Sequence, residues 1–323
     1  MSLRFEILKT LGDGRFHSGA QLGVALGVSR TAVWKHLQEL GELGLDIFAV
    51  PGKGYRLASP LELLQRESIL NSLTPESRAL LSTLELHPHL ESTNTYLSGK
   101  AAATLASGFA CLAEYQSSGR GRRGRTWVSP FAANVYLSLS WRFAVSPTAL
   151  SGLGLVSGVA VARALQQAGL RDIGLKWPND LLWNGRKLAG TLLEMSGESY
   201  GPINVVIGVG LNVRMPAPAG EQIEQAWVDM ETALGKSVSR NTMAGLLLHH
   251  LLLALQQFQA KGLAPFIHEW QQWDVVTGKT IRLQLPNETL TGIAKGIDRN
   301  GALLLQNRGI ITSHMAGEVS VRL

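Results

Sequence analysis

A stretch of nine residues combines the two residue types best suited to holding an anion. The sequence "GRGRRGRTW" (119–127) puts four arginines among three glycines and closes on Trp127. Arginine neutralises carboxylate and phosphate through forked hydrogen bonds, and glycine lets the backbone come close to a ligand. The pattern therefore predicts an ordered anion-binding loop. Trp127 either packs over a ligand ring or fills the core, and the core is the default interpretation from the residue alone.

Known phosphate-binding motifs fit this stretch only in part. Gly119, Gly121 and Gly124 match G-x-G-x-x-G, but a dinucleotide site also needs a helix directly afterwards and an acidic residue about twenty positions on. The following "TWVSPFAAN" does not favour a helix start, and the chain then reads "WRF" without an acid. A Walker loop fails because the "GKT" at Gly278 has Trp273 where the motif needs glycine. A disordered arginine-glycine segment would repeat, whereas this one is single.

Four further short motifs place polar or charged side chains beside small residues. "KWPND" (176–180) combines a cation, a rigid proline turn, an amide and a carboxylate, and "RKLAG" (186–190) sets Lys187 beside small residues. "ESTN" (91–94) clusters hydrogen-bonding groups, and "GVGLN" (208–212) ends an apolar strand with two glycines and an amide. Each motif alone is a weak signal, and "KWPND" is also compatible with a surface turn. Together, and in this order, they are specific.

The composition describes a folded protein with basic character. The chain has 323 residues, of which 45% are apolar and 17% charged, a balance typical of globular proteins and not of disordered ones. Its length suits one to three domains. The net charge of +6 and the pI near 9.6 favour anionic partners such as nucleic acids or phosphates. The single cysteine, Cys111, excludes an internal disulfide and lies in the apolar run "FACLAEY", so we expect it to be buried.

One uncharged segment is long enough to cross a membrane. Residues 143–162 carry no charge over twenty positions, and a span needs about 20 apolar residues. Pro147, several hydroxyl residues and three glycines interrupt the segment, and Arg163 follows it directly. We therefore predict a buried helix that starts near Pro147. The first residues, "MSLRFEILK", contain charged side chains at Arg4, Glu6 and Lys9, so they lack the uncharged apolar core of a signal peptide. We therefore expect a soluble cytoplasmic protein without membrane contact.

The first sixty residues carry the signals of a small helical domain. The segment "LRFEILKTL" has apolar residues on roughly one face of a helix. Ser18 is suited to cap a short second helix, and Gly27 to end it in a tight turn. Ser29 is suited to cap a third helix, in which Val33 and Leu37 lie on one face. Two short helices joined by a glycine turn form a helix-turn-helix, and the following "DIFAVPGKGYRL" predicts a hairpin, which is a wing.

The polar face of the third helix and the wing favour DNA binding over a plain helical adaptor. Side chains that reach phosphates and base edges lie opposite the apolar face. Residues 1–60 hold seven basic and five acidic residues, so the placement of the charges matters more than their sum. The predicted DNA-binding residues are Ser29, Arg30, Thr31, Lys35 and Gln38 on the helix and Lys53 and Arg56 on the wing.

The remaining chain predicts a mixed α+β domain followed by a small β-domain. Residues 58–85 suggest a linker and one helix. From about 86 to 273, strand-like runs cluster instead of alternating with helices, which favours α+β over a doubly wound sheet. From about 277, short runs broken by Asn, Gly and Asp turns indicate a small β-barrel. The strand candidates are "FACLAEY", "NVYLSLSW", "KLAGTLLEM" and "INVVIGVGLNV", and the helix candidates are 147–169, 240–261 and 265–273.

The motifs, taken in order, resemble those of a known enzyme family. "ESTN", "EYQSSGRGRRGRTW", "KWPND", "KLAG" and "GVGLN" are similar to the motifs of the biotin–protein ligases. The segments "HSGAQLG", "SRTAVWKH", "VPGKGY" and "GIDRNGALLL" extend the resemblance over essentially the whole chain, and the winged helix resembles the bifunctional members that also repress the biotin operon. The resemblance implies a winged helix-turn-helix DNA-binding domain over 1–63, a mixed-sheet ligase domain of the biotin/lipoate type over 64–275 and an SH3-like barrel over 276–323.

The resemblance implies a two-step acyl transfer that uses ATP. Biotin and ATP form biotinyl-5′-adenylate and pyrophosphate, and the adenylate then acylates a lysine of biotin carboxyl carrier protein. The first step drives a carboxylate onto an α-phosphate, so preorganised cations, including Mg²⁺, must offset the repulsion of two negative groups. No general base is needed there, because the carboxylate is already ionised. Mg²⁺ is expected to arrive with ATP, and no protein ligand is assigned to it.

The resemblance, carried over residue by residue, implies roles for individual side chains. Lys187 is expected to bridge the biotin carboxylate and the α-phosphate, which makes it the leading catalytic residue. Arg122 and Asp180 are further catalytic candidates, and Asp180 is a candidate to help deprotonate the acceptor lysine. The loop 119–127 is expected to close as a flexible flap that shields the adenylate from water. The residues expected to bind biotin are Ser92, Thr93, Asn94, Gln116, Arg120, Gly121, Arg122 and Lys187, and those expected to bind the nucleotide are Arg125, Trp127, Lys176, Asn179, Asp180 and Asn212.

The resemblance also implies partners and leaves two alternatives. The expected partners are biotin carboxyl carrier protein, operator DNA and, once the adenylate is bound, a second copy of the chain. One alternative is a biotin-sensing transcription factor that no longer acylates, which Lys187 and the complete arginine loop disfavour. The other is a lipoate–protein ligase, which "GRGRRGRTW" and the winged helix disfavour.

Overall fold

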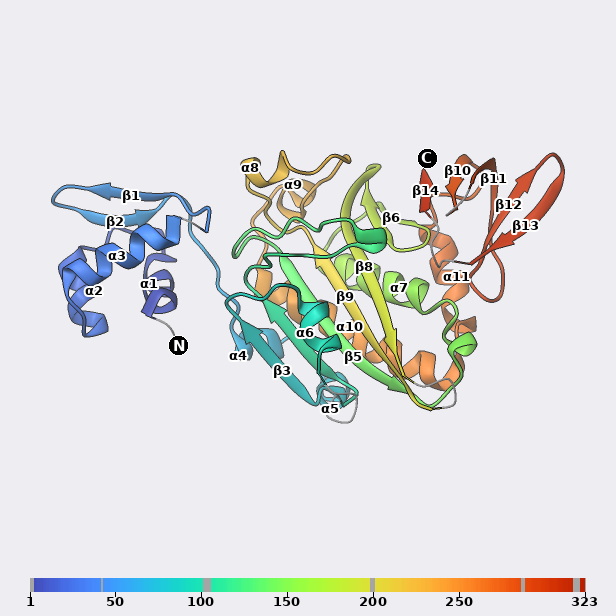
Figure 1. Cartoon of the computed structure of the whole chain (residues 1–323), viewed down its shortest axis with the longest axis horizontal. Coiled ribbons are helices and arrows are strands. Elements are labelled where there is room, and N and C mark those ends of the chain that lie inside the picture. The colour runs from blue at the N-terminus through green and yellow to red at the C-terminus, as the bar shows by residue number, and fades with distance from the viewer. Residues whose placement is uncertain are drawn as a thin grey trace.

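Three parts follow one another along the long axis of the molecule (Figure 1). The structure is a computed structural model of the chain, and it describes residues 3–41, 43–100, 106–197, 201–285, 288–315 and 320–322. A small helical part begins the chain, a large sheet with helices forms its middle, and a small β-part ends it.

The N-terminal part is a winged helix-turn-helix, as predicted. Ser18 caps the second helix by accepting a hydrogen bond from the backbone N–H of Gln21, and Gly27 ends that helix with a φ of 66°. The Ser29 hydroxyl accepts from the backbone N–H of Ala32 at 3.1 Å and caps the third helix. The caps satisfy N–H groups that short helices otherwise leave without partners. The elements are α1 (Leu3–Leu11), α2 (Gly19–Leu26), α3 (Arg30–Gly41), β1 (Ile47–Val50) and β2 (Gly54–Leu57).

The segment between the wing and the sheet contains two short helices, so the predicted single helix is wrong. α4 (Arg66–Leu70) and α5 (Pro75–Leu80) precede the edge strand β3 (Thr83–His87). Thr74 caps α5 by accepting from the backbone N–H of Ser77, and Pro75 occupies its first turn. Proline is tolerated in a first turn but breaks a helix interior, so the chain must restart there.

A seven-stranded sheet forms the middle of the molecule, in the order β3-β4-β5-β9-β8-β7-β6. Among the described strands, β3 and β4 pair in parallel and the other neighbours pair antiparallel. Such a mixed sheet confirms the α+β prediction. The strands after β3 are β4 (Phe109–Ala113), β5 (Val135–Phe143), β6 (Ile173–Lys176), β7 (Asp180–Trp183), β8 (Arg186–Ser196) and β9 (Ile203–Leu211).

The two faces of the sheet are covered differently. Leu137 and Leu139 of β5 join the main core with α7 (Leu153–Gln167) and α10 (Arg240–Lys261). Successive strand residues point to opposite faces, so Ser138 faces the other side, where α6 (Thr93–Ser98) packs against β5 and β9. The face that carries α6 is therefore free to hold polar side chains. The remaining helices are η1 (Arg122–Gly124), η2 (Pro147–Leu150), α8 (Ala217–Gly220), α9 (Met230–Leu234) and α11 (Ala264–Trp273).

The long apolar helix candidate is interrupted but buried. η2 and α7 are separated at Gly152, whose φ of 81° cannot continue an α-helix, so the prediction of one helix over 147–169 is wrong in that detail. Pro147–Gln167 has the length and hydropathy of a membrane span, and it is the one such stretch among the described residues. Within the most apolar 18 residues of this stretch, 67% are buried inside the protein, which agrees with the predicted core helix. Cys111 is fully buried, as predicted, and burial raises the pKa of its thiol.

The C-terminal part is a five-stranded antiparallel sheet in the order β13-β12-β11-β10-β14, which confirms the predicted small β-domain. Its Ile281 and Leu305 belong to the same hydrophobic core as the central sheet, so the two parts pack directly on each other. Leu63 packs with the N-terminal cluster and Leu64 with the main core. We keep 63/64 and 275/276 as proposed domain boundaries. The strands are β10 (Thr280–Gln284), β11 (Thr289–Ile297), β12 (Leu303–Asn307), β13 (Ile310–His314) and β14 (Ser320–Arg322).

Candidate active site

One cavity of about 870 Å³ opens on the face of the sheet that carries α6. Its walls come from α6, the loop 119–127, the turn before β7, and strands β8 and β9. The structure thus brings every residue expected to bind biotin or nucleotide to one place. These lining residues are Ser92, Thr93, Asn94, Gln116, Arg120, Gly121, Arg122, Arg125, Trp127, Lys176, Asn179, Asp180, Lys187 and Asn212.

Neutral hydrogen-bonding groups form one end of the cavity. Ser92 caps α6, so the backbone N–H of Thr93 points out of the first turn and donates to Gln116 Oε1 at 2.8 Å. Gln116 Nε2 in turn donates to the hydroxyl of Ser129 at 3.0 Å. All four side chains are buried. A buried polar network of this kind has fixed donors and acceptors and suits a neutral ligand ring with donors and acceptors of its own.

Asn94 lies on the floor of the same end. Its Oδ1 accepts from the hydroxyl of Ser138 at 2.6 Å, and its Nδ2 donates to Glu194 at 2.9 Å. A Cβ built on Gly208 would lie 2.3 Å from Asn94 Oδ1, far inside contact distance. Glycine in "GVGLN" is therefore required because the amide rests directly on the backbone of β9.

Trp127 forms a wall between the two ends. A Cβ on Gly210 would lie 2.3 Å from its ring, and one on Gly190 would lie 3.4 Å from it, so the indole packs flat against backbone of β8 and β9. The ammonium of Lys187 lies 5.4 Å from the ring centroid, within range of a cation–π interaction. Trp127 Nε1 is buried and has no hydrogen-bond partner among the described residues. The ring thus fills a packed position and also lines the cavity.

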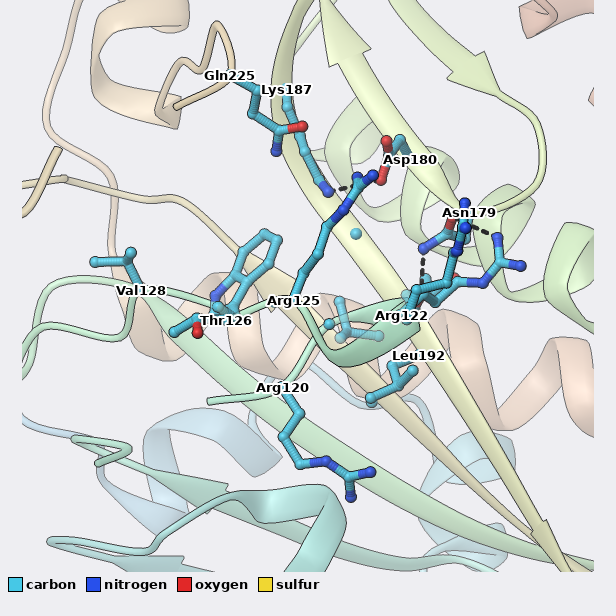
Figure 2. A pocket seen from close by; sticks show the side chains of 18 of the residues that line it. Arg120, Arg122, Arg125, Thr126, Val128, Asn179, Asp180, Lys187, Leu192 and Gln225 are labelled. Atoms are coloured by element: carbon cyan, nitrogen blue, oxygen red, sulfur yellow. Dashed lines mark hydrogen bonds and ion pairs between the residues drawn. The ribbon is translucent and has the colours of Figure 1, made fainter. Parts of the chain in front are cut away.

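A cation and a carboxylate face each other at the other end. Lys187 Nζ lies 2.7 Å from Asp180 Oδ1, and the two side chains are 16% and 17% exposed. They come from neighbouring strands, β8 and β7, whose register shifts between Leu181 and Leu182. Figure 2 shows the Lys187 and Asp180 side chains converging, with Arg125 reaching toward them from the loop.

Arg122 and Asn179 form a second contact at this end. Arg122 Nη1 donates to Asn179 Oδ1 at 3.2 Å (Figure 2). Burial lowers the pKa of the Arg122 guanidinium, and the charge of Asp180 opposes that shift. Asn179 itself is fixed to β8, because its Nδ2 donates to the carbonyl of Thr191 at 2.8 Å. The amide thus places a desolvated guanidinium at the edge of the cavity.

The "KWPND" segment is a buried turn, so the alternative of a surface turn is wrong. It joins β6 to β7, and Trp177 is 1% exposed. Trp177 Nε1 donates to the carbonyl of Gly301 in the C-terminal part at 3.1 Å. The turn is therefore held from behind by a different domain, and its polar residues face the cavity.

The arginine loop folds back on itself as a tight hairpin. Gly121 N–H donates to the carbonyl of Arg125 at 2.7 Å, and Trp127 N–H donates to the carbonyl of Gly119 at 2.9 Å. The four arginines then diverge. Arg122 and Arg125 point to the end with Asp180, while the guanidinium of Arg120 points the opposite way (Figure 2). Arg123, with a φ of 57°, is exposed at the tip.

Lys176 and Asn212 are the last two of the predicted ligand-binding residues that line the cavity. A neighbouring segment also lines it and was not predicted from the sequence. Asn212 is buried, and its Nδ2 donates to the carbonyl of Val228 at 3.1 Å. Residues 222–225 and Trp227 also line the cavity, with Trp227 beside Lys187 in a short parallel bridge. No motif in the sequence marked this segment.

The predicted DNA-binding residues are mostly exposed. The hydroxyl of Ser29 is engaged in capping α3. Arg56 is half-buried, and its guanidinium carbon lies 5.0 Å from the ring centroid of Phe16 and 5.3 Å from that of Phe48. The other predicted side chains are exposed, and they are Arg30, Thr31, Lys35 and Gln38 on α3 and Lys53 in the turn of the wing.

Three family models match the chain, one for each part of the fold. The model of the HTH domain matches residues 4–56, and the model of the biotin/lipoate A/B protein ligase family matches residues 86–212. The model of the biotin protein ligase C-terminal domain matches residues 276–322. The class defined by fold and cavity is thus a protein ligase of the biotin/lipoate type with an N-terminal DNA-binding module.

Similar proteins narrow the class. The bifunctional ligase/repressor BirA of Escherichia coli is 44% identical over 98% of this chain and 96% of its own length. The protein of the same name from Bacillus subtilis is 34% identical over 94% of both chains. A solved structure of the biotin protein ligase from Aquifex aeolicus with biotin and ATP is 26% identical, with a TM-score of 0.64 over 75% of this chain and 99% of that one. The chain belongs to the biotin protein ligase family, in its bifunctional ligase/repressor form.

Proposed function

We propose that the protein joins biotin to ATP, transfers the biotinyl group to a lysine of biotin carboxyl carrier protein, and represses the biotin operon when it holds the adenylate. The observation that carries this proposal is the polarity of the cavity. Neutral donors and acceptors around Gln116 lie at one end, and the cations around Lys187 lie at the other. Biotinyl-5′-adenylate has the same polarity, with a ureido ring at one end and a phosphate at the other.

The first step places two negative groups against each other. A carboxylate oxygen of biotin attacks the α-phosphorus of ATP, the bond to the bridging oxygen breaks, and pyrophosphate leaves. Lys187 and Arg122 are the cations positioned to offset this charge, and each is held in place by a hydrogen-bonding partner. Preorganised charge of this kind lowers an electrostatic barrier because it need not reorient during the reaction.

Mg²⁺ is assigned to the nucleotide and not to a protein site. Asp180, the carboxylate beside the predicted phosphate position, is already paired with Lys187. When bound with ATP, Mg²⁺ supplies further positive charge at the phosphates.

The second step is an aminolysis of the mixed anhydride. The ε-amine of the acceptor lysine attacks the acyl carbon, the bond to the phosphate oxygen breaks, and AMP leaves. The amine must lose a proton, and Asp180 is the residue we propose to assist, because its carboxylate lies beside the group that contacts the phosphate. The loop 119–127 is proposed to cover the adenylate until the acceptor arrives.

The repressor half of the proposal rests on α3. Its exposed Arg30, Thr31, Lys35 and Gln38 form a surface that suits the major groove. We propose that two adenylate-bound copies place two such helices on operator DNA in the cytoplasm. The likeness to bifunctional ligase/repressors over nearly the full chain supports this assignment.

A labelling experiment tests the enzyme. The purified protein is incubated with ATP and labelled biotin or labelled lipoate, with and without a biotin carboxyl carrier domain. We expect pyrophosphate release with biotin alone and label on the acceptor only when it is present. Labelling by lipoate in place of biotin would indicate the lipoate ligase alternative. Biotin binding without pyrophosphate release would indicate the sensor that does not acylate.

A further inference from the structure

One carboxylate joins two elements of the cavity that the sequence keeps far apart. Glu194 of β8 accepts a hydrogen bond from Asn94 of α6 at 2.9 Å through its Oε2. Its Oε1 lies 2.8 Å from a guanidinium nitrogen of Arg120 in the arginine loop. The Glu194 side chain is 26% exposed and that of Arg120 is 49% exposed. The floor of the neutral end and the base of the loop thus share one acceptor.

The contact with Asn94 sets the direction of its amide. A carboxylate can only accept, so it requires the Nδ2 side of the amide. The hydroxyl of Ser138 donates to Oδ1 on the opposite side at 2.6 Å, and the carbonyl of Leu192 adds a longer acceptor for Nδ2 at 3.4 Å. Asn94 Oδ1 then faces the backbone of β9 on the cavity floor, near Gly208. In this orientation it offers an acceptor to a ring N–H.

The contact with Arg120 holds the loop. Figure 2 shows the Arg120 side chain extending away from the arginines at the Asp180 end. Besides Glu194, Arg120 Nη1 donates to Thr95 Oγ1 on α6 at 3.3 Å. The first residues of the loop are therefore tied to the same helix that carries Asn94. Arg120 acts in the structure as a tether and not as a group aimed at the phosphate end.

We propose that Glu194 is a positioning residue that orients Asn94 for the ureido ring of biotin and latches the arginine loop through Arg120. The inference rests on the function proposed above. It gives Glu194 two separable effects, one on biotin binding and one on retention of the adenylate. Loss of the Asn94 contact weakens biotin binding, because the amide is free to turn its donor toward a position that needs an acceptor. Loss of the Arg120 contact lets the loop open, so the adenylate escapes before transfer.

Two substitutions at one position separate these effects. Glu194→Gln keeps an acceptor for Asn94 but removes the charge that attracts Arg120. Glu194→Ala removes both contacts. We expect Glu194→Ala to raise the Kd for biotin, measured by calorimetry without ATP, by about tenfold, as befits a lost hydrogen bond to a charged group. We expect Glu194→Gln to bind biotin within about threefold of wild type.

Release of the adenylate supplies the second readout. Wild type and variants are given biotin and ATP, and free biotinyl-5′-adenylate plus AMP is counted per biotinyl group transferred to the acceptor. Both Glu194 variants and Arg120→Ala should raise this ratio by at least about threefold. The double variant Glu194→Gln with Arg120→Ala should leak no more than either single variant, because the two side chains act as one contact.

A matched control separates a specific effect from a general one. Glu269 pairs with Arg163 away from the cavity, and its side chain is 27% exposed, close to the 26% of Glu194. Glu269→Gln should change neither readout. If Glu194→Ala fails to fold, Glu194→Gln and the exposed Arg120→Ala still decide the latch. Unchanged leakage in both would overturn it, and an unchanged biotin Kd in folded Glu194→Ala would overturn the role toward Asn94. If wild type itself forms no adenylate, the proposed function fails and not this inference alone.

Discussion

At the scale of single residues, the cations of the cavity are held in fixed directions before any ligand binds. Lys187 is held by Asp180 and Arg122 by Asn179, so neither has to search for its direction when an anion enters. An incoming phosphate can exchange with these partners while the side chains stay in place. Preorganisation is the property that makes such charges useful for catalysis as well as for binding.

Replacing Lys187 should separate chemistry from binding. Lys187→Ala removes the cation matched to charge that develops at the α-phosphate, which typically costs on the order of 3 kcal/mol, roughly a hundredfold in rate. Pyrophosphate release should fall by that factor, while biotin binding changes far less. Lys236→Ala, at an exposed position outside the cavity lining, serves as the control. Release from Lys187→Ala within a factor of three of wild type would show that the assigned role is wrong.

His250 should make stability depend on pH. Burial, with help from His249 and Arg163, lowers the pKa of His250 to about 4 from an ordinary 6.5. The unfolded chain then takes up a proton that the folded chain does not, so stability is fully present above pH 6.5 and is lost as pH falls toward 4. His250→Gln removes this proton uptake. Because His250 is only partly buried, wild type should lose about 1 kcal/mol more than the variant between pH 7 and pH 5.

Chemical denaturation at the two pH values measures the effect. The exposed His268 on α11 offers a control, since His268→Gln should lose stability as wild type does. Equal slopes with pH in wild type and His250→Gln would contradict the prediction.

At the scale of elements, the arginine loop is a hairpin with little to hold it. Three backbone hydrogen bonds lie within it, Arg123 and Gly124 have positive φ, and the Arg120 contact is its tether to α6. Like charges at its tip repel each other when no anion is present. The loop should therefore be open part of the time in the free protein and closed when biotin and ATP are bound.

Limited digestion with trypsin tests this motion. Cleavage after Arg122 or Arg123 should be fast in the free protein and several-fold slower with biotin and ATP together, because binding shifts the population toward the closed loop. Each ligand alone should protect less. The same cleavage rate in all four conditions would argue against a flap.

At the scale of the whole molecule, the DNA-binding domain is attached to the catalytic domain by a buried polar contact. Glu62 in the linker accepts from Asn241 Nδ2 at 2.9 Å, and its carbonyl accepts from Arg240 Nη1 at 2.6 Å. Arg240 also pairs with Glu114 at 2.8 Å, and the two side chains are 5% and 2% exposed. The linker is therefore seated against α10 and does not hang free, which limits how the winged helix can lie relative to the ligase site.

The two activities should separate by mutation in an asymmetric way. Arg30→Ala with Lys35→Ala removes two exposed cations from α3, so binding to operator DNA should weaken and its salt dependence should flatten by about two charges. Biotinylation of the acceptor should stay near normal. Lys187→Ala should lose acylation and also the gain in DNA binding that ATP and biotin give, because no adenylate forms.

Gel shifts over a salt series measure the DNA half, on duplexes selected by the wild-type protein from random sequence. Acceptor labelling measures the other half in the same preparations. If the Arg30/Lys35 double variant binds the selected DNA as wild type does, the helix-turn-helix is a scaffold and the repressor half of the proposal fails.

The sequence by itself determined the local elements and the make-up of the site. Caps at Ser18 and Ser29 and the glycine turn between them defined the helix-turn-helix, because such caps act through neighbours only a few residues away. The helix expected over 240–261 forms over the same residues, Arg240–Lys261. The motifs, read in order, predicted one polar and cationic site, and their fourteen named residues do line one cavity.

Only the tertiary structure decided which way the side chains point and what joins the motifs. Nothing local shows that Arg120 turns away from Arg122 and Arg125, because its partner Glu194 lies on a distant strand. The segment 222–227 joins the cavity only because β8 pairs with it beside Lys187. Residue type and spacing determine which chemistry is possible, whereas side-chain direction depends on contacts between segments that meet only after the chain has folded.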